Sequence, residues 1–210
     1  NSSLPIDKSL IAGKLPNGLH YFVRANSRPE NRAELRLVVR AGSILEDEDQ
    51  QGLAHIVEHM AFNGTTRFGA RDLVGYFESI GARFGAHLNA HTSFDETVYK
   101  LQIPMDDPDI LEKSFWILRD WASELLFLPE EIERERKVGL EEWRQGRGAM
   151  ARIREQLLPK VYYGSKYVDR LLALAGKVFF RATRSYMPKA LAPRVGNWLS
   201  CFKRLLADME

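Results

Sequence analysis

The chain has 210 residues and a net charge of only +2, a length that suits one substantial core, or one domain with an appendage, and leaves too little chain for two full domains. Its composition, 45% hydrophobic and 28% charged, is that of an ordinary soluble globular protein, with no apolar run long enough to span a membrane. The single cysteine, Cys201, excludes an internal disulfide.

The N-terminal region predicts a mature start followed by two strands. Residues 1–5 contain neither the basic nor the apolar region of a secretion signal, and the chain does not begin with Met, so we expect a trimmed N-terminus. Residues 15–18 form a turn sequence, after which His20–Ala25 is a predicted strand. A second strand is predicted over Ala33–Ala41, and Gly42 with an acidic loop ends it.

From Gly52 the hydrophobic period changes from that of a strand to that of a helix. Apolar residues at i, i+3, i+4 and i+7 predict the buried stripe of an amphipathic helix that ends near residue 63, namely Leu53, Ile56, Val57 and Met60. A second helix is predicted from about Ala70 to Ile80, where Gly81 stops it.

The next predicted elements are a hairpin and two long helices. The β-like stretches Ala82–Ala90 and Thr97–Ile103 are separated by a polar turn over residues 91–93. Helical patterns follow over about Asp109–Phe127 and Pro129–Leu158, the latter opening with a proline and acidic residues. The order β-β-α-α-β-β-α-α predicts an α+β fold with helices packed on one face of a mainly antiparallel sheet.

The C-terminal residues have weaker patterns and a different charge. We predict one domain over residues 1–172 and a basic, unassigned tail over residues 173–210, with a short helix near Trp198–Ala207. Residues 1–150 carry 18 Lys+Arg against 24 Asp+Glu, whereas residues 151–210 carry 12 against 4. Such asymmetry can mark a nucleic-acid or membrane-surface segment. Because no recognisable nucleic-acid module accompanies it, we interpret the region as solvated and expect no nucleic-acid partner.

The chemistry is concentrated in the first predicted helix. His55, Glu58 and His59 stand at i, i+3 and i+4, so they project from one side, opposite the apolar stripe. Two histidines one turn apart can both ligate one zinc ion, and the intervening carboxylate can stand beside an open coordination position. Isolated histidines are commonly surface groups, but this spacing on a correctly phased helix favours a metal site.

A catalytic zinc site needs a third protein ligand. The long acidic helix offers candidates, since Glu135 and Glu142 are two turns apart and share a face, while Glu141 points about 100° away from Glu142. Spacing alone does not choose among these three glutamates. The other glutamates of this helix are interpreted as solvated.

Three segments together resemble the pitrilysin/insulinase family of zinc metalloproteases, the inverzincins. They are the H-x-x-E-H helix with its flanks (residues 51–65), a following hairpin (residues 85–99) and an E-R-x-V-x-x-x-E helix (residues 135–144). Within the family, residues 15–18, 33–51 and 141–143 are most similar to the PqqL-like bacterial zinc proteases. The resemblance spans roughly residues 4–172 and agrees with the predicted fold.

Carried over by position, the resemblance implies one Zn²⁺ per chain, with His55, His59 and Glu142 as metal ligands. Glu135, the first residue of the last motif, becomes the carboxylate that orients a ligating histidine. Glu58 becomes the catalytic base, which takes a proton from water and later delivers it to the leaving amine.

The resemblance also implies how a substrate binds. A peptide or small protein would bind as an extended strand against the Ala86–Ala90 edge, through backbone hydrogen bonds and with little sequence preference. Asn89 and Ala90 are the candidate substrate-binding residues. For Asn89 the alternative of a turn-facing amide is equally compatible with the sequence.

Family members close their active chamber with a second homologous domain or subunit. The resemblance fades after Leu171, where a turn and a buried strand are expected, so the sheet is predicted to lack its last strands. We therefore expect the chain to bind zinc but to cleave peptides poorly alone. The likeness to the bacterial subgroup implies an exported, periplasmic location.

Two other functions are compatible with the sequence. A non-catalytic member of the fold would hold peptides or serve as a structural subunit, but such members typically lose motif residues that are all present here. A zinc-stabilised binding module would carry a structural metal, but structural sites usually have four protein ligands and are often rich in cysteine. Both observations favour catalysis.

Overall fold

The protein is described by a computed structural model, which covers residues 6–48, 50–69, 72–146, 148–168 and 170. The strands are β1 (Leu10–Lys14), β2 (His20–Arg24), β3 (Arg32–Val39), β4 (Leu88–Thr92) and β5 (Thr97–Pro104). The helices are α1 (Leu53–Met60), α2 (Asp72–Ser79), α3 (Pro108–Ser123), α4 (Pro129–Gln145) and α5 (Ala149–Val161), with a 3-10 turn, η1 (Ser43–Leu45), before α1.

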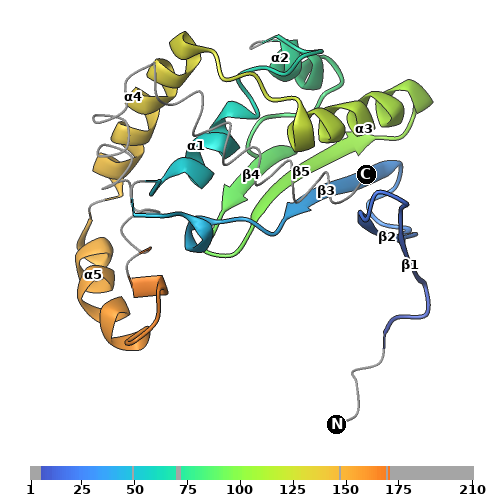
Figure 1. Ribbon diagram of the computed structural model, residues 1–210. Coiled ribbons are helices and arrows are strands. Elements are labelled where there is room, and N and C mark those ends of the chain that lie inside the picture. The colour runs from blue at the N-terminus through green and yellow to red at the C-terminus, as the bar shows by residue number, and fades with distance from the viewer. Residues whose placement is uncertain (1–5, 49, 70–71, 147, 169, 171–210) are drawn as a thin grey trace.

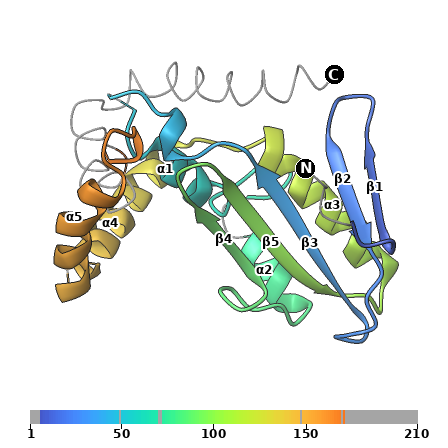
Figure 2. The same ribbon diagram turned by 90° about the horizontal axis from the view of Figure 1, so that it is seen from below.

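The central sheet is antiparallel, with β5 between β3 and β4. Figure 2 shows helices α2 and α3 behind one face of this sheet. Strands β1 and β2 form a separate hairpin. The predicted α+β fold, with helices on one face of an antiparallel sheet, is confirmed.

The core lies between this sheet and its helices. Apolar side chains of α2, α3 and β5 fill it, among them Leu73, Phe77, Ile117, Trp121 and Leu101. Each is at most 1% exposed. At ~25 cal/mol per Å² of apolar surface removed from water, this burial is the main force that holds the sheet and helices together.

Helix α1 lies at one end of this core, between the sheet and α4 (Figure 1). Its predicted apolar stripe is buried in two smaller hydrophobic clusters. Ala54 and Val57 pack with Ala41, and the remaining stripe residues pack against Phe127 and Ile132. The indole N–H of Trp121 donates to the Ala61 carbonyl at 2.8 Å, just beyond the C-terminal end of the helix. The orientation of α1 is therefore set along its apolar stripe and at its C-terminal end.

Several predicted boundaries were wrong. The turn at residues 15–18 has a strand on both sides, so β1 is an additional element; Gly18 adopts φ 87°, which suits glycine. Strand β4 begins at Leu88 rather than Ala82, and residues 91–92 belong to it rather than to the turn. The long second helix is two helices, because Gly146 ends α4 and Gly148 caps α5 where helix propensity is low.

The predicted helix near Trp198–Ala207 and the rest of the tail lie outside the described residues. Within the described ranges, no helix is both long enough and apolar enough to cross a membrane.

Candidate metal centre

Two histidines of α1 face each other across one helical turn. The Nε2 atoms of His55 and His59 are 3.1 Å apart, and their rings meet edge to face with centroids 4.6 Å apart. The buried stripe occupies the other side of α1, and both imidazoles lie within reach of carboxylates of α4. The i, i+4 spacing thus gives the pair of nitrogen atoms that the sequence predicted.

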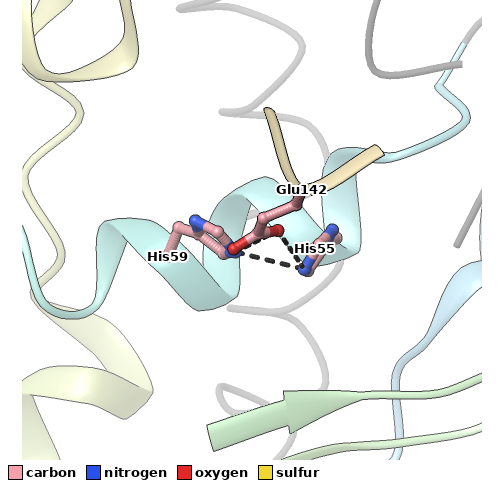
Figure 3. A group of neighbouring side chains, drawn as sticks. All are labelled: His55, His59 and Glu142. Atoms are coloured by element: carbon pink, nitrogen blue, oxygen red, sulfur yellow. Dashed lines mark hydrogen bonds and ion pairs between the residues drawn. The ribbon is translucent and has the colours of Figure 1, made fainter. Parts of the chain in front are cut away.

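Glu142, on α4, is the third member of this group (Figure 3). Its Oε2 atom lies 3.9 Å from His55 Nε2 and 3.7 Å from His59 Nε2. Ligand atoms of a tetrahedral site with bonds of 2.0–2.1 Å lie about 3.3 Å apart. The three separations in this structure bracket that value, so the donor set fits a single small cation without a change of backbone.

Glu135 contacts the ring nitrogen of His59 that faces away from His55. His59 Nδ1 and Glu135 Oε2 are 2.7 Å apart, and both side chains are nearly buried, at 14% and 13% exposure. An ionised carboxylate can only accept, so Nδ1 carries the proton of neutral His59, and the Nε2 lone pair is directed toward His55 and Glu142. Glu135 thereby selects the tautomer that a metal ligand requires.

The pKa values of these groups reflect the same contacts. Burial alone would lower the pKa of His59, but the hydrogen bond to Glu135 and the nearby charges of Glu142 and Glu58 outweigh it, so this pKa is raised. Burial and the neighbouring His59 lower the pKa of His55. Burial would raise the pKa of Glu135, yet hydrogen bonds from His59 and Asn63 lower it. His59 is therefore the histidine of the pair that takes up an added proton first as the pH falls.

Glu58 lies on α1 beside the histidines and is only 7% exposed. Its Oε2 atom accepts a hydrogen bond of 2.7 Å from the Thr92 hydroxyl on β4. The Thr97 hydroxyl, 3.3 Å from that of Thr92, donates its own proton to the Ala41 carbonyl at 2.9 Å. The bond from Thr92 holds the carboxylate of Glu58 against the end of strand β4.

The N-terminus of α1 is stabilised by a carboxylate from the preceding loop rather than by the side chain of its N-cap residue, Gly52. Glu46 is fully buried, and its two oxygens accept the backbone N–H groups of Gly52 and Ala54, each at 2.9 Å. Burial raises the pKa of Glu46 to about 7, although these two hydrogen bonds and the nearby Arg170 oppose the shift. A negative charge here also suits the helix dipole.

Asn89 and Ala90 lie on β4, which is an edge strand that packs against α1. The amide of Gln102 donates to the His87 carbonyl, so by alternation the backbone groups of Asn89 face β5 and those of Ala90 face the free edge. The Asn89 side-chain oxygen accepts the Ala90 N–H at 2.8 Å, and its amide nitrogen donates to the Gly85 carbonyl at 3.2 Å. Asn89 is thus a strand residue whose side chain covers part of that edge.

The structure brings together the predicted residues of α1 and α4, with Asn89 and Ala90 on the neighbouring strand. Glu141 points away and pairs with Arg144 on the solvent side. Three contributors were missed: Thr92, Glu46 and Arg170. Thr92 had been assigned to a turn, and the period-two alternation from Ala90 could have found it. Glu46 lies in the acidic loop shortly before the motif, where no periodicity distinguishes it from its acidic neighbours, and Arg170 is far away in sequence.

Comparison with known proteins gives consistent matches. The model of the insulinase family (peptidase family M16) matches residues 21–174. The protein named "Zinc protease PQQL-like" of Arabidopsis thaliana is 48% identical over 76% of this chain and 17% of its own length. "Probable zinc protease PqqL" of Haemophilus influenzae is 41% identical over 81% of this chain and 18% of its own length. The chain thus spans about a sixth of the length of these curated relatives.

The fold also matches solved structures. The crystal structure of the first half of the periplasmic protease PqqL from Escherichia coli aligns with a TM-score of 0.78 and 34% identity. The alignment covers 88% of this chain and 41% of that one.

Proposed function

The chain belongs to the insulinase family, peptidase family M16, and from this membership we propose that it forms the zinc-binding half of an endopeptidase active site. The observation that carries the proposal is the convergence of His55, His59 and Glu142 within 4.8 Å of one another, from two helices. The similar proteins of Arabidopsis thaliana and Haemophilus influenzae are named as zinc proteases, which supports zinc as the metal.

In this proposal Zn²⁺ is held by His55, His59 and Glu142, with Glu135 fixing the tautomer of His59. Zinc in such a site supplies a Lewis acid that polarises a carbonyl and lowers the pKa of water to about 7. Three protein ligands leave one coordination position open, as catalytic zinc sites require and closed structural sites lack. This difference favours a hydrolase over a zinc-stabilised binding module.

Glu58 is the proposed catalytic base. It lies on the same face of α1 as the two histidines, and the hydroxyl of Thr92 restrains its carboxylate. An acceptor held at this position can take a proton from the attacking water and return it to the leaving amine. Because Glu58 is nearly buried, little solvent competes for that proton.

The proposed substrate is a peptide or small protein that pairs with the free edge of β4. Ala90 presents its backbone groups there, and an added strand would hydrogen-bond to them regardless of substrate sequence. The Asn89 carboxamide now occupies the Ala90 N–H, so a substrate strand must displace it. Asn89 and Ala90 are therefore proposed as substrate-binding residues.

We propose residues 1–172 as the catalytic domain and a second homologous domain or subunit as its partner. The family match over residues 21–174 supports the boundary. The match covers 41% of the separately solved first half of the similar Escherichia coli protein and 21% of that whole protein. We expect peptide cleavage by the 210-residue chain alone to be near background, because half of the substrate-holding surface is then missing.

The location is a further part of the proposal. The similar Escherichia coli protein is described as a periplasmic protease, which supports export of this chain. Cell fractionation with a periplasmic marker enzyme would test this directly. Recovery of the native protein with cytosolic markers would refute it.

The decisive experiment measures bound zinc by elemental analysis in the purified chain and in three variants. The wild type is expected to hold about one zinc ion per chain, and His59→Ala about none. Glu142→Gln should retain zinc weakly, since an amide oxygen is a poorer ligand than a carboxylate. Glu141→Gln is the matched control on the same helix and should retain the full amount.

The catalytic part needs the second half of the active site. A longer polypeptide that includes it should cleave a quenched peptide, and Glu58→Gln should abolish cleavage while bound zinc stays near one per chain. Full zinc with no cleavage by any such polypeptide would instead favour the non-catalytic, peptide-holding member of the fold. Zinc retained by His59→Ala would refute the metal site itself.

A further inference from the structure

A segment far from the metal ligands in sequence packs beside the helix that carries them. This C-terminal segment, defined here as residues 162–168 with Arg170, contacts η1 and the β4–β5 turn. Lys166 donates to the Ile44 carbonyl at 2.7 Å, and the Tyr167 hydroxyl donates to Asp95 at 2.7 Å. The rings of Phe94, Tyr162 and Tyr167 form a cluster, with Phe94 6.1 Å from Tyr162 and 4.9 Å from Tyr167 between centroids. The segment is therefore docked through several independent contacts.

Arg170 is the buried end of this segment. It is 1% exposed, and its guanidinium donates to the Glu46 carbonyl at 2.7 Å and to the Glu48 carboxylate at 3.0 Å. A fully buried arginine is unusual and is strongly unfavourable unless it is paired. The ion pair with Glu48 therefore offsets part of the cost of burying Arg170.

Glu46 connects Arg170 to the metal helix. Both of its carboxylate oxygens accept N–H groups at the N-terminal end of α1, one of them from Ala54, the residue before His55. The ionised form of Glu46 makes the stronger acceptor for these N–H groups, and a buried carboxylate is costly without a nearby cation. Arg170 is a nearby cation: its guanidinium bonds the Glu46 backbone carbonyl and the Glu48 carboxylate, and its charge opposes the rise in the pKa of Glu46.

The consequence for α1 is geometric. With eight residues, α1 is too short to be stable in isolation, so its N-terminal turn keeps its position only through tertiary contacts. His55 lies in that turn, and its Nε2 must stay near the Nε2 of His59 for both to reach one cation. A shift of a few tenths of an ångström at Ala54 would be transmitted to His55 before His59.

Resting on the zinc site proposed above, we propose that Arg170 is a positioning residue of the metal centre, acting through the Glu46 carboxylate on His55. The sequence between Glu142 and Arg170 would then be required for full metal affinity, although it contains no ligand. The effect is directional: it should alter the placement of His55 more than that of His59, which Glu135 holds independently.

The test compares Arg170→Met with Tyr167→Phe in the 210-residue chain at pH 8. Methionine keeps the length of the side chain but removes the charge, whereas phenylalanine removes only the hydroxyl bonded to Asp95. We expect Arg170→Met to weaken zinc binding about tenfold in chelator competition, at the lower end of the range for outer-shell partners. The visible absorption of the cobalt-loaded protein should change, because it reports ligand geometry. Tyr167→Phe should match the wild type in both measurements.

Glu46→Gln and the double variant Glu46→Gln/Arg170→Met test whether Arg170 acts through Glu46. If both residues act on the same cap, the double variant should lose less affinity than the product of the single losses. Should Arg170→Met fail to fold, Arg170→Lys carries the test, with an expected weakening of about threefold, because lysine keeps the charge but not the forked donor.

Each outcome has a distinct meaning. Unchanged zinc affinity and cobalt spectrum in a folded Arg170 variant, despite a lower melting temperature, would show that Arg170 only stabilises the fold and would overturn the proposal. Independent, multiplicative losses in the double variant would overturn the route through Glu46. Failure of the wild type to bind zinc would instead refute the proposed metal site, and this proposal with it.

Discussion

Helices α1 and α5 differ in how the rest of the chain holds them. Helix α1 has eight residues, six of them buried, and contacts its surroundings at both ends and along its stripe. Helix α5 has thirteen residues, none of them buried. Its apolar positions 150, 153, 157 and 161 are spaced as a stripe, yet each is more than half exposed.

The contrast shows where this fold gains its precision. A short helix is marginal in water, so α1 exists because its surroundings fix it, and the same contacts aim its histidines. Helix α5 needs no such precision for the metal site. The same kind of substitution should therefore have a larger effect in α1 than in α5.

The largest expected difference is in stability. Ile56→Ala in α1 should lower the free energy of unfolding by about 2–5 kcal/mol, because Ile56 is 2% exposed and its removal leaves a cavity. Ile153→Ala in α5 is the matched substitution at 53% exposure, and it should cost less than about 0.5 kcal/mol. Urea unfolding of the metal-free chain measures both. Equal losses would mean that α5 is packed as tightly as α1.

The next effect concerns metal affinity. Glu135→Gln should weaken zinc binding about 10- to 100-fold, because the amide no longer selects the His59 tautomer with a charged acceptor. Chelator competition measures the change. The same variant should retain the fold, since glutamine preserves the side-chain volume. Zinc binding that is as tight as in the wild type would exclude a role for Glu135 in orienting His59.

A third effect concerns pH. The pKa of His59 is raised, so its protonated form competes with the metal already above the ordinary histidine value. Zinc affinity should therefore fall as pH falls through that pKa, by about tenfold per pH unit for one displaced proton. In Glu135→Gln the fall should begin at lower pH, because a major cause of the raised pKa is gone. An affinity independent of pH between 5 and 8 would contradict this assignment.

The smallest expected effect is on α4. Glu141 and Arg144 form an exposed pair one turn apart, and such pairs contribute about 0–1 kcal/mol. Glu141→Gln should therefore change neither stability nor zinc affinity measurably, although Glu142→Gln beside it should weaken zinc binding. Thermal unfolding and chelator competition on the two variants test this contrast. A larger loss for Glu141→Gln would reverse the predicted faces of α4.

Local sequence patterns were sufficient to predict helix α1 and the residues of the metal site that it carries. The 3.6-residue period predicted the buried stripe of α1 and thereby the side from which His55, Glu58 and His59 project, as the structure has them. The seven-residue spacing of Glu135 and Glu142 predicted a shared face. It did not decide which glutamate would reach the histidines, because that depends on how α4 crosses α1.

The missed features depend on contacts between distant segments. Glu46 and Arg170 are 124 residues apart, and nothing near either one marks the bond between them. The break between α4 and α5 was missed although Gly146 and Gly148 were visible, since the helical charge pattern continues across them. Strand β4 was misplaced because Gly85 and its neighbours read as strand, whereas they form the loop before it.

The most direct test of the metal centre is anomalous diffraction at the zinc absorption edge from crystals of the zinc-loaded chain. The account predicts one peak, about 2.0–2.2 Å from His55 Nε2, His59 Nε2 and a Glu142 carboxylate oxygen. A peak elsewhere, or Glu142 far outside ligating distance of a zinc ion bound to both histidines, would contradict it.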